Sequence, residues 1–429
     1  MLNFYKIPYL IVLFSLTLPI PAAYFASKNI SYFADFITLI VFGFYLSYLN
    51  FNLPKKLIKN ILLPSIIFSS LSYFVVDSIG TKSVYVILFL TYIFYSFISK
   101  SKIKNITFIL LNQVKNIYLT LLIFLVLEFF IIYLDFDHIF IPISSIAYPI
   151  NFSFVKLYKF YNSASLFQNI GLSNMHGLNS LLLGSQGASI IVVICLLIFS
   201  KLIKTNYKIK HDSYIFLFCL IAYPFLATVT SNLVLIITLI LLIFIFPNSR
   251  IKRIKFQIIF ASSFILFGYP LLQLIAFRIR SKESLEFYFI NFYQPIQFIL
   301  QSNLRDLAFG VKITELGQMS ADFGFGMVLI TNGIFIILFL MIAFIILFKA
   351  TLKQLEIDKQ NLIFNNEWSY LATLNLLASF IWIFSLIHYT TALETGGRHI
   401  LAFHLAILIL SLKNLRKKNL LNQLNNDSF

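Results

Sequence analysis

The sequence predicts an all-α fold, a polytopic bundle of about twelve membrane-spanning helices, and three observations support this prediction. The chain has 429 residues, of which 59% are hydrophobic and only 11% are charged, which is too apolar for a globular protein with one core. Apolar runs such as 117–134 and 326–348 are long enough to cross about 30 Å of hydrocarbon as helices. Short polar turns separate most of these runs.

The apolar runs can be placed in order along the chain. They lie near 7–26, 31–49, 61–78, 84–99, 117–134, 180–200, 214–230, 233–247, 256–276, 326–348, 369–387 and 397–412. The first run follows Lys6 and lacks a typical signal-peptide cleavage site, so we expect it to be retained as a span. Cys195 and Cys219 both fall inside predicted spans, so they provide no disulfide framework.

The basic residues predict the orientation of these spans. When the connections alternate between two sides, one side collects 23 of the 33 Lys and Arg residues, and both termini lie on it. Since cytoplasmic loops carry an excess of Lys and Arg, this side is predicted to be cytoplasmic. The net charge of +17 is therefore mainly a topology signal, and no nucleic-acid partner is expected.

Two connections on the outer side are much longer than the others. They cover about 135–179 and 277–325, whereas the last outer turn covers only 388–397. Long structureless loops in compact proteins usually have a function. The whole chain, 1–429, is predicted to form a single transmembrane domain that includes these loops.

The second long loop carries an excess of cations on the side where cations are normally rare. Arg278, Arg280, Lys282, Arg305 and Lys312 are half of the ten basic residues predicted on the outer side. Because Lys and Arg are disfavoured in translocated loops, we infer that this cluster binds an anion. The alternative is that single side chains reach the membrane surface and pair with neighbouring glutamates.

Ionisable residues also gather in the stretch "HYTTALETGGRHILAFH" (388–404). Arg398 and His399 are predicted in the first turn of the last helix, directly after two glycines that supply a flexible break. Glu394 lies four residues before Arg398, so a local ion pair is the alternative to a functional role. His404 lies farther into the predicted span, where a packed, hydrogen-bonded histidine is the alternative.

Several motifs of known enzyme classes are absent from the sequence. It contains no Walker A loop, no Rossmann glycine pattern, no HExxH and no Cys/His spacing typical of a metal site. Neither a metal nor a cofactor is therefore expected.

One stretch, "SADFGFGMVLITNGIFIILFL" (320–340), resembles the segment that closes the large outer loop in O-antigen polymerases (Wzy-type) and the related O-antigen ligases. In those families a polar residue is followed by an aromatic-rich helix start and then by a glycine inside the span. Here the pair is Asp322 and Gly333. The ligases typically have a histidine at the polar position, so Asp322 favours the polymerases. The spacing from His176 to Gly187 resembles polar-to-glycine spacings of polymerase loops.

The resemblance implies a multi-pass protein of the bacterial inner membrane. Such a protein transfers a glycan from undecaprenyl pyrophosphate onto another lipid-linked repeat unit at the periplasmic face. The expected partners are this lipid-linked oligosaccharide, membrane lipids and a chain-length regulator protein. An O-antigen ligase and a flippase or other transporter are the alternatives, although transporters place essential charges at mid-membrane depth and the predicted spans carry almost none there.

The implied reaction sets demands that the outer residues can meet. A sugar hydroxyl attacks an anomeric carbon as pyrophosphate leaves, which requires a base and cations. Arginines bind phosphate through paired hydrogen bonds, so they can replace a metal. The candidate bases are Asp322, Glu394, His176 and Glu128, and the candidate substrate-binding residues are Arg278, Arg280, Arg305, Arg398, Lys282, Lys312 and His399.

Overall fold

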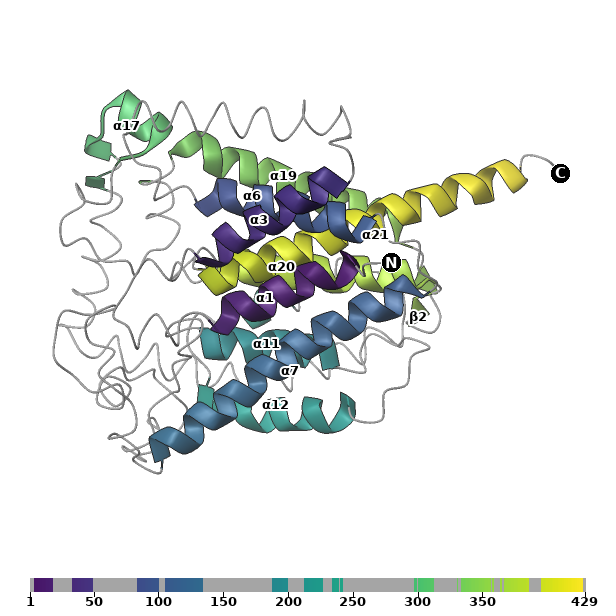
Figure 1. The fold of residues 1–429 in the computed structure, drawn as a ribbon, viewed down its shortest axis with the longest axis horizontal. Coiled ribbons are helices and arrows are strands. Elements are labelled where there is room, and N and C mark those ends of the chain that lie inside the picture. Colours follow the sequence, from purple (N-terminus) through teal and green to yellow (C-terminus); the bar gives the residue numbers. More distant parts are fainter. Residues whose placement is uncertain are drawn as a thin grey trace.

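The computed structural model of the chain is a bundle of helices (Figure 1). It describes residues 4–17, 33–48, 83–99, 105–133, 187–199, 212–226, 234–238, 240–241, 297–298, 300–311, 330, 333–355, 357–358, 363–364, 366–385 and 395–426. In these ranges the regular elements are helical except β1 (Ile357–Asp358) and β2 (Ile363–Phe364), which pair antiparallel. The predicted all-α fold is confirmed for the described residues, with this short strand pair as an addition.

The helices have the following bounds: η1 Phe4–Lys6, α1 Ile7–Thr17, α3 Phe33–Tyr48, α6 Ser83–Ser99, α7 Ile106–Tyr133, α11 Gly187–Phe199, α12 Asp212–Leu226, α17 Leu304–Phe309, α19 Ile334–Gln354, α20 Glu367–Phe384 and α21 Thr395–Asn426. All of them except η1 and α17 coincide with a predicted span. The spans predicted near 61–78 and 256–276 lie outside the described residues. The total of twelve spans therefore stays a prediction.

Two helices extend well beyond their predicted spans at the end that carries polar residues. Helix α7 begins at Ile106 rather than near 117, and α21 continues to Asn426 rather than ending near 412. The α7 extension contains Lys115 and the α21 extension contains several basic residues, and the polar parts of both segments resemble polar segments outside the spans. A helix satisfies its own backbone hydrogen bonds, so it can continue past the apolar segment into a polar environment.

Five polar contacts between different helices lie at one end of the bundle. They join Gln113 to the Tyr5 carbonyl, Lys115 to Asp212, Thr107 to Glu367, Lys413 to Tyr95, and Asn419 to Gln354. All ten residues lie at or near helix ends that the predicted topology assigns to the cytoplasmic side. The start of α1 and the C-terminal part of α21 both lie at this end, on the right in Figure 1.

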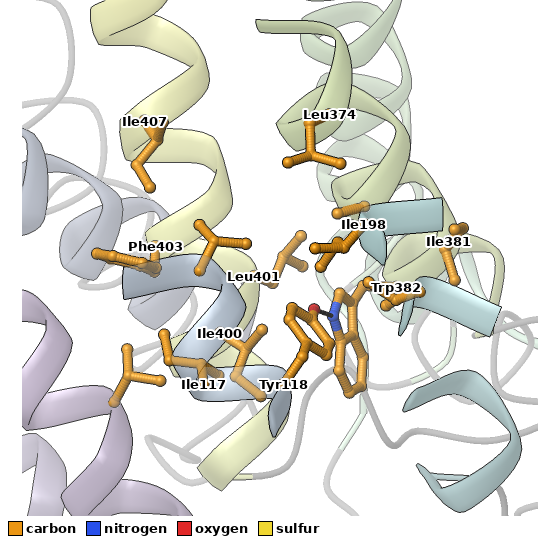
Figure 2. Close-up of a cluster of buried hydrophobic side chains, with 14 of the residues drawn as sticks. Ile117, Tyr118, Ile198, Leu374, Ile381, Trp382, Ile400, Leu401, Phe403 and Ile407 are labelled. Atoms are coloured by element: carbon orange, nitrogen blue, oxygen red, sulfur yellow. Dashed lines mark hydrogen bonds between the residues drawn. The ribbon is translucent and has the colours of Figure 1, made fainter. Parts of the chain in front are cut away.

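Helix α21 occupies the centre of the described bundle. It packs most extensively against α20 and α6, and it also contacts α1 and α19. Ile400, Ala402, Phe403, Ala406 and Ile407 are fully buried along it. Figure 2 shows this core, in which side chains of α21 meet those of α7, α11 and α20.

Helix α19 has two apolar faces with different surroundings. Its inner face packs through Phe344, Leu347 and Phe348 against buried residues of α20 and α21. The opposite face carries six large apolar side chains that are 46–60% exposed: Phe335, Leu338, Met341, Ile342, Ile345 and Ile346. Helices α3 and α12 expose similar apolar side chains, including Phe44 and Ile221. An exposed apolar surface on several helices is typical of a protein that contacts a membrane or a partner.

Two described segments are long and apolar enough to cross a membrane, namely Ile106–Val126 in α7 and Gly397–Leu420 in α21. Their length and apolar composition agree with the apolar composition of the whole chain.

The ion pair between Lys115 of α7 and Asp212 of α12 is largely shielded from solvent, with side chains 9% and 17% exposed. Replacing Lys115 with Met leaves the carboxylate shielded and unpaired, so we expect a loss of about 2 kcal/mol in the free energy of unfolding. Adding Asp212→Asn is expected to recover part of that loss. Thermal or chemical unfolding in detergent measures both effects.

The matched control is Lys413→Met, since Lys413 is an exposed lysine at the same end of the bundle. It donates only to the Tyr95 hydroxyl, and its loss is expected to stay below about 0.5 kcal/mol. Equal losses for the two lysines, or strict additivity of the Lys115 and Asp212 changes, would contradict the assigned role of the ion pair.

Candidate functional site

The structure describes four of the predicted site residues. Arg305 lies on α17, Arg398 and His399 lie on α21, and Glu128 lies on α7, for which only the backbone is described at that position. The other predicted residues lie outside the described ranges: Asp322, Glu394, His176, Arg278, Arg280, Lys282 and Lys312. Their roles stay predictions.

Arg398 and His399 lie side by side in the sequence near the start of α21, and both are buried, with exposed fractions of 5% and 0%. The His399 ring lies 6.5 Å from the Phe94 ring of α6. Helix α21 begins at Thr395, so the two glycines before Arg398 belong to its first turn and do not form a break before it. Ionisable side chains buried within an apolar bundle are costly, which makes them candidates for a functional role.

A hydrogen-bonded chain of side chains lies deeper in the bundle, between α7, α20 and α21. Trp382 Nε1 donates to the Tyr118 hydroxyl (2.9 Å), and this hydroxyl lies 2.8 Å from His404 Nε2. His404 Nδ1 lies 2.7 Å from Asn375 Oδ1, and Asn375 Nδ2 donates to the Leu371 carbonyl (2.8 Å). Trp382, Tyr118, His404 and Asn375 are all fully buried or nearly so. Figure 2 shows the Trp382 and Tyr118 side chains meeting in the core.

The directions of these bonds follow from the donors and acceptors available. The Asn375 amide nitrogen donates to a carbonyl, so its oxygen accepts and His404 Nδ1 must carry the proton. In a neutral imidazole Nε2 is then an acceptor, and it receives the Tyr118 O–H. The Tyr118 oxygen in turn accepts from Trp382, whose ring nitrogen can only donate. Every polar atom of His404 therefore has a partner.

This arrangement determines what His404 does in the described structure. Its two bonds join α21 to α7 and to α20, and its ring stacks on the Tyr118 ring with centroids 5.7 Å apart. The alternative predicted for His404, a packed and hydrogen-bonded histidine, is confirmed. Sequence reasoning missed Tyr118, Asn375 and Trp382, although an amide within an otherwise apolar span is a signal that can identify Asn375.

A second feature of the site is the junction between α17 and the start of α19. The Val311 N–H donates to the Ile330 carbonyl (2.8 Å), and the Phe309 and Phe335 rings meet with centroids 6.3 Å apart. Gly333 has φ +79°, and a Cβ atom there would lie only 2.1 Å from the Ala308 carbonyl oxygen. Only glycine allows both the backbone conformation and this close approach. Gly333 therefore packs against α17 and directly precedes α19, whereas the resemblance implied a glycine inside the predicted span 326–348.

Arg305 is exposed on α17, which the side chain of Asn303 caps by accepting from the Asp306 N–H (2.8 Å). Because α17 packs against α19, Arg305 is held near the start of that helix. The structure thus places Arg398 and His399 together in the bundle and Arg305 on a separate, surface helix. Among the described residues there is no group of three or more His, Cys, Asp or Glu side chains that could hold a metal ion.

No family model, no curated protein and no solved structure matches this chain.

Replacing His404 with Phe preserves much of the ring volume and removes both hydrogen bonds. The Asn375 oxygen and the Tyr118 O–H then stay buried without a partner, so we expect a loss of about 2–3 kcal/mol in the free energy of unfolding. Tyr118→Phe removes a single hydroxyl and is expected to give a smaller but measurable loss. Unfolding of the purified chain in detergent measures both variants.

Ser379→Ala on α20 is the matched control. The Ser379 hydroxyl is buried and has no hydrogen-bond partner among the described residues. Its removal is expected to leave stability unchanged or to raise it, because no bond is lost. If Ser379→Ala were as destabilising as His404→Phe, burial alone and not hydrogen bonding would explain the effect.

Gly333→Ala is expected to open the junction between α17 and α19. The positive φ costs an alanine about 1–2 kcal/mol, and the contact with the Ala308 carbonyl adds to this. Hydrogen exchange of the amides in 304–311 is therefore expected to rise by at least about tenfold. Gly43→Ala is the control, since a Cβ at Gly43 of α3 meets no atom within 4 Å. Equal exchange in the two variants would refute the assigned role of Gly333.

Proposed function

We propose that this chain is a multi-pass membrane glycosyltransferase that polymerises lipid-linked oligosaccharide repeat units. Its substrate is an oligosaccharide on undecaprenyl pyrophosphate, and its product is a surface polysaccharide such as O-antigen, made at the periplasmic face of a bacterial inner membrane. The observation that supports this proposal most directly is the role of Gly333. This residue is the glycine of the stretch 320–340 that resembles the polymerases, and it packs against α17 of the cation-bearing outer loop directly before α19.

The distribution of polar and apolar side chains supports the membrane part of the proposal. The described bundle exposes large apolar side chains on α3, α12 and α19 and buries Arg398, His399 and His404. In water this arrangement would leave large apolar side chains in contact with solvent, which is unfavourable. In a bilayer the same side chains contact lipid, and the polar groups stay inside the bundle.

The cations have a direct role in the proposed reaction. The oxygen of an acceptor sugar hydroxyl forms a bond to the donor's anomeric carbon while the bond from that carbon to the pyrophosphate oxygen breaks. The hydroxyl proton passes to a base, for which Asp322, Glu394, His176 and Glu128 are the candidates. The leaving pyrophosphate keeps the electron pair and stays on its lipid, and positive side chains stabilise its added charge.

Arg398 is the described residue best suited to that task. Its guanidinium is permanently charged and is held in an apolar bundle, where an attraction to phosphate is much stronger than in water. We propose that the pyrophosphate approaches Arg398 from the side of the segment 388–394, which precedes α21. Arg278, Arg280, Lys282, Arg305 and Lys312 then bind it from the long outer loop, and His399 assists from α21.

The test is to compare Arg398→Ala with Arg398→Lys in a strain that lacks the chromosomal copy. Arg398→Ala is expected to abolish long glycan chains, because the phosphate loses its paired hydrogen bonds, whereas Arg398→Lys keeps the charge and is expected to retain part of the activity. Gel profiles of surface glycans measure chain length, and immunoblots of the membrane fraction confirm equal amounts of protein. Normal chain lengths in Arg398→Ala would refute the proposed role.

The deletion strain itself separates the proposed function from its alternatives. A polymerase defect leaves a single repeat unit attached to the lipid A core. A ligase defect leaves bare core with stored lipid-linked polymer, and a flippase defect leaves repeat units on the cytoplasmic side. Either of the last two results would overturn the assignment as a polymerase.

A further inference from the structure

The outward face of α19 changes from apolar to basic along its length. Lys349 and Lys353 are exposed and follow Ile346 by one and two helical turns on the same face. This face is apolar from Phe335 to Ile346. It is basic at the end of α19 that the predicted topology assigns to the cytoplasmic side. An apolar stretch ending in cations matches a lipid molecule, which has acyl chains and a charged headgroup.

The last part of α21 adds cations beside those of α19. Arg416 and Lys417 are exposed on the C-terminal part of α21, shortly before Asn419. Asn419 Nδ2 donates to Gln354 Oε1 (2.9 Å), so this part of α21 lies directly against the end of α19. Lys349, Lys353, Arg416 and Lys417 together form what we call the inner basic surface.

Three acidic residues are described at this end of the bundle; Asp358 of β1 follows α19, and the other two, Asp212 and Glu367, have partners on other helices. Asp212 pairs with Lys115, and Glu367 accepts a hydrogen bond from Thr107. The four exposed cations of the inner basic surface outnumber Asp358, the one described acid at this end without a partner named above. The surface therefore has a net positive charge where it meets the apolar face of α19.

We propose that the inner basic surface binds an anionic phospholipid of the inner leaflet. The lipid phosphate lies against Lys349, Lys353, Arg416 and Lys417, and the acyl chains lie along the exposed apolar face of α19. Clusters of basic residues directly beside the cytoplasmic end of a span attract anionic headgroups, each residue adding to the affinity. The inference rests on the membrane placement in the proposed function but not on the polymerase activity.

The experiment uses the purified full chain in a non-ionic detergent, titrated with phosphatidylglycerol and, separately, with phosphatidylcholine. Native mass spectrometry counts the bound lipids. The wild-type chain is expected to bind phosphatidylglycerol at least about tenfold more tightly, and the preference is expected to weaken in high salt. Inorganic phosphate is not expected to displace the lipid, because it lacks the acyl chains that contact α19.

The variant Lys349→Gln/Lys353→Gln/Arg416→Gln/Lys417→Gln is expected to reduce the preference to about twofold or less. All four side chains are exposed, so its unfolding temperature is expected to match that of the wild type. Lys6→Gln is the control, because Lys6 is exposed at the same end of the bundle on a different element, η1. It is expected to keep the wild-type preference.

Three results would overturn the inference. They are equal affinity for the two lipids, a preference that survives the fourfold variant, and displacement of the lipid by inorganic phosphate alone. If alkaline carbonate extracts the chain from membranes, the chain is not an integral membrane protein, and both proposals are refuted. A normal glycan profile in the deletion strain, together with the lipid preference, would refute the proposed polymerase function and leave the lipid-binding site supported.

Discussion

The hydrogen-bonded chain from Trp382 through Tyr118 and His404 to Asn375 is the constraint on which the arrangement of the central helices depends. In this bundle both the core and the outward faces are apolar, so burial alone scarcely distinguishes one rotation of a helix from another. Hydrogen bonds are directional, and an unpaired polar atom in such an interior is costly. The four side chains therefore specify how α21 faces α7 and α20.

The ends of the bundle are held by different means. At one end, side-chain contacts such as Lys115 with Asp212 and Thr107 with Glu367 connect α7 to its neighbours. At the other, Gly333 brings backbone against backbone where α17 meets α19. Side-chain contacts suit the end with many charged residues. The backbone contact at Gly333 requires only that this residue has no side chain. Between the two ends, hydrophobic packing and the hydrogen bonds of His404 hold the helices together.

The burial of Arg398 and His399 changes the interpretation of the outer site. The sequence predicted both residues in the first turn of the last helix, and the structure shows in addition that both side chains are buried. His404 is satisfied by its two partners and belongs to the support of the bundle. Of the three ionisable residues in this part of α21, Arg398 is thus the one best suited to meet a phosphate.

The sequence by itself determined the helical class, the position of most of the described helices and the concentration of basic residues in particular segments, because these depend on local composition and periodicity. It placed α6 and α20 within two or three residues of their observed bounds, but it ended α21 too early because a basic helix extension resembles a loop in hydropathy. Gly333 was identified as a residue of interest only because the stretch 320–340 resembles a segment of O-antigen polymerases. Only the tertiary structure decided that Tyr118, Asn375 and Trp382 meet His404, that Gly333 has no room for a side chain, and that α19 keeps one apolar face exposed. These facts depend on contacts between residues far apart in the chain, which no local pattern encodes.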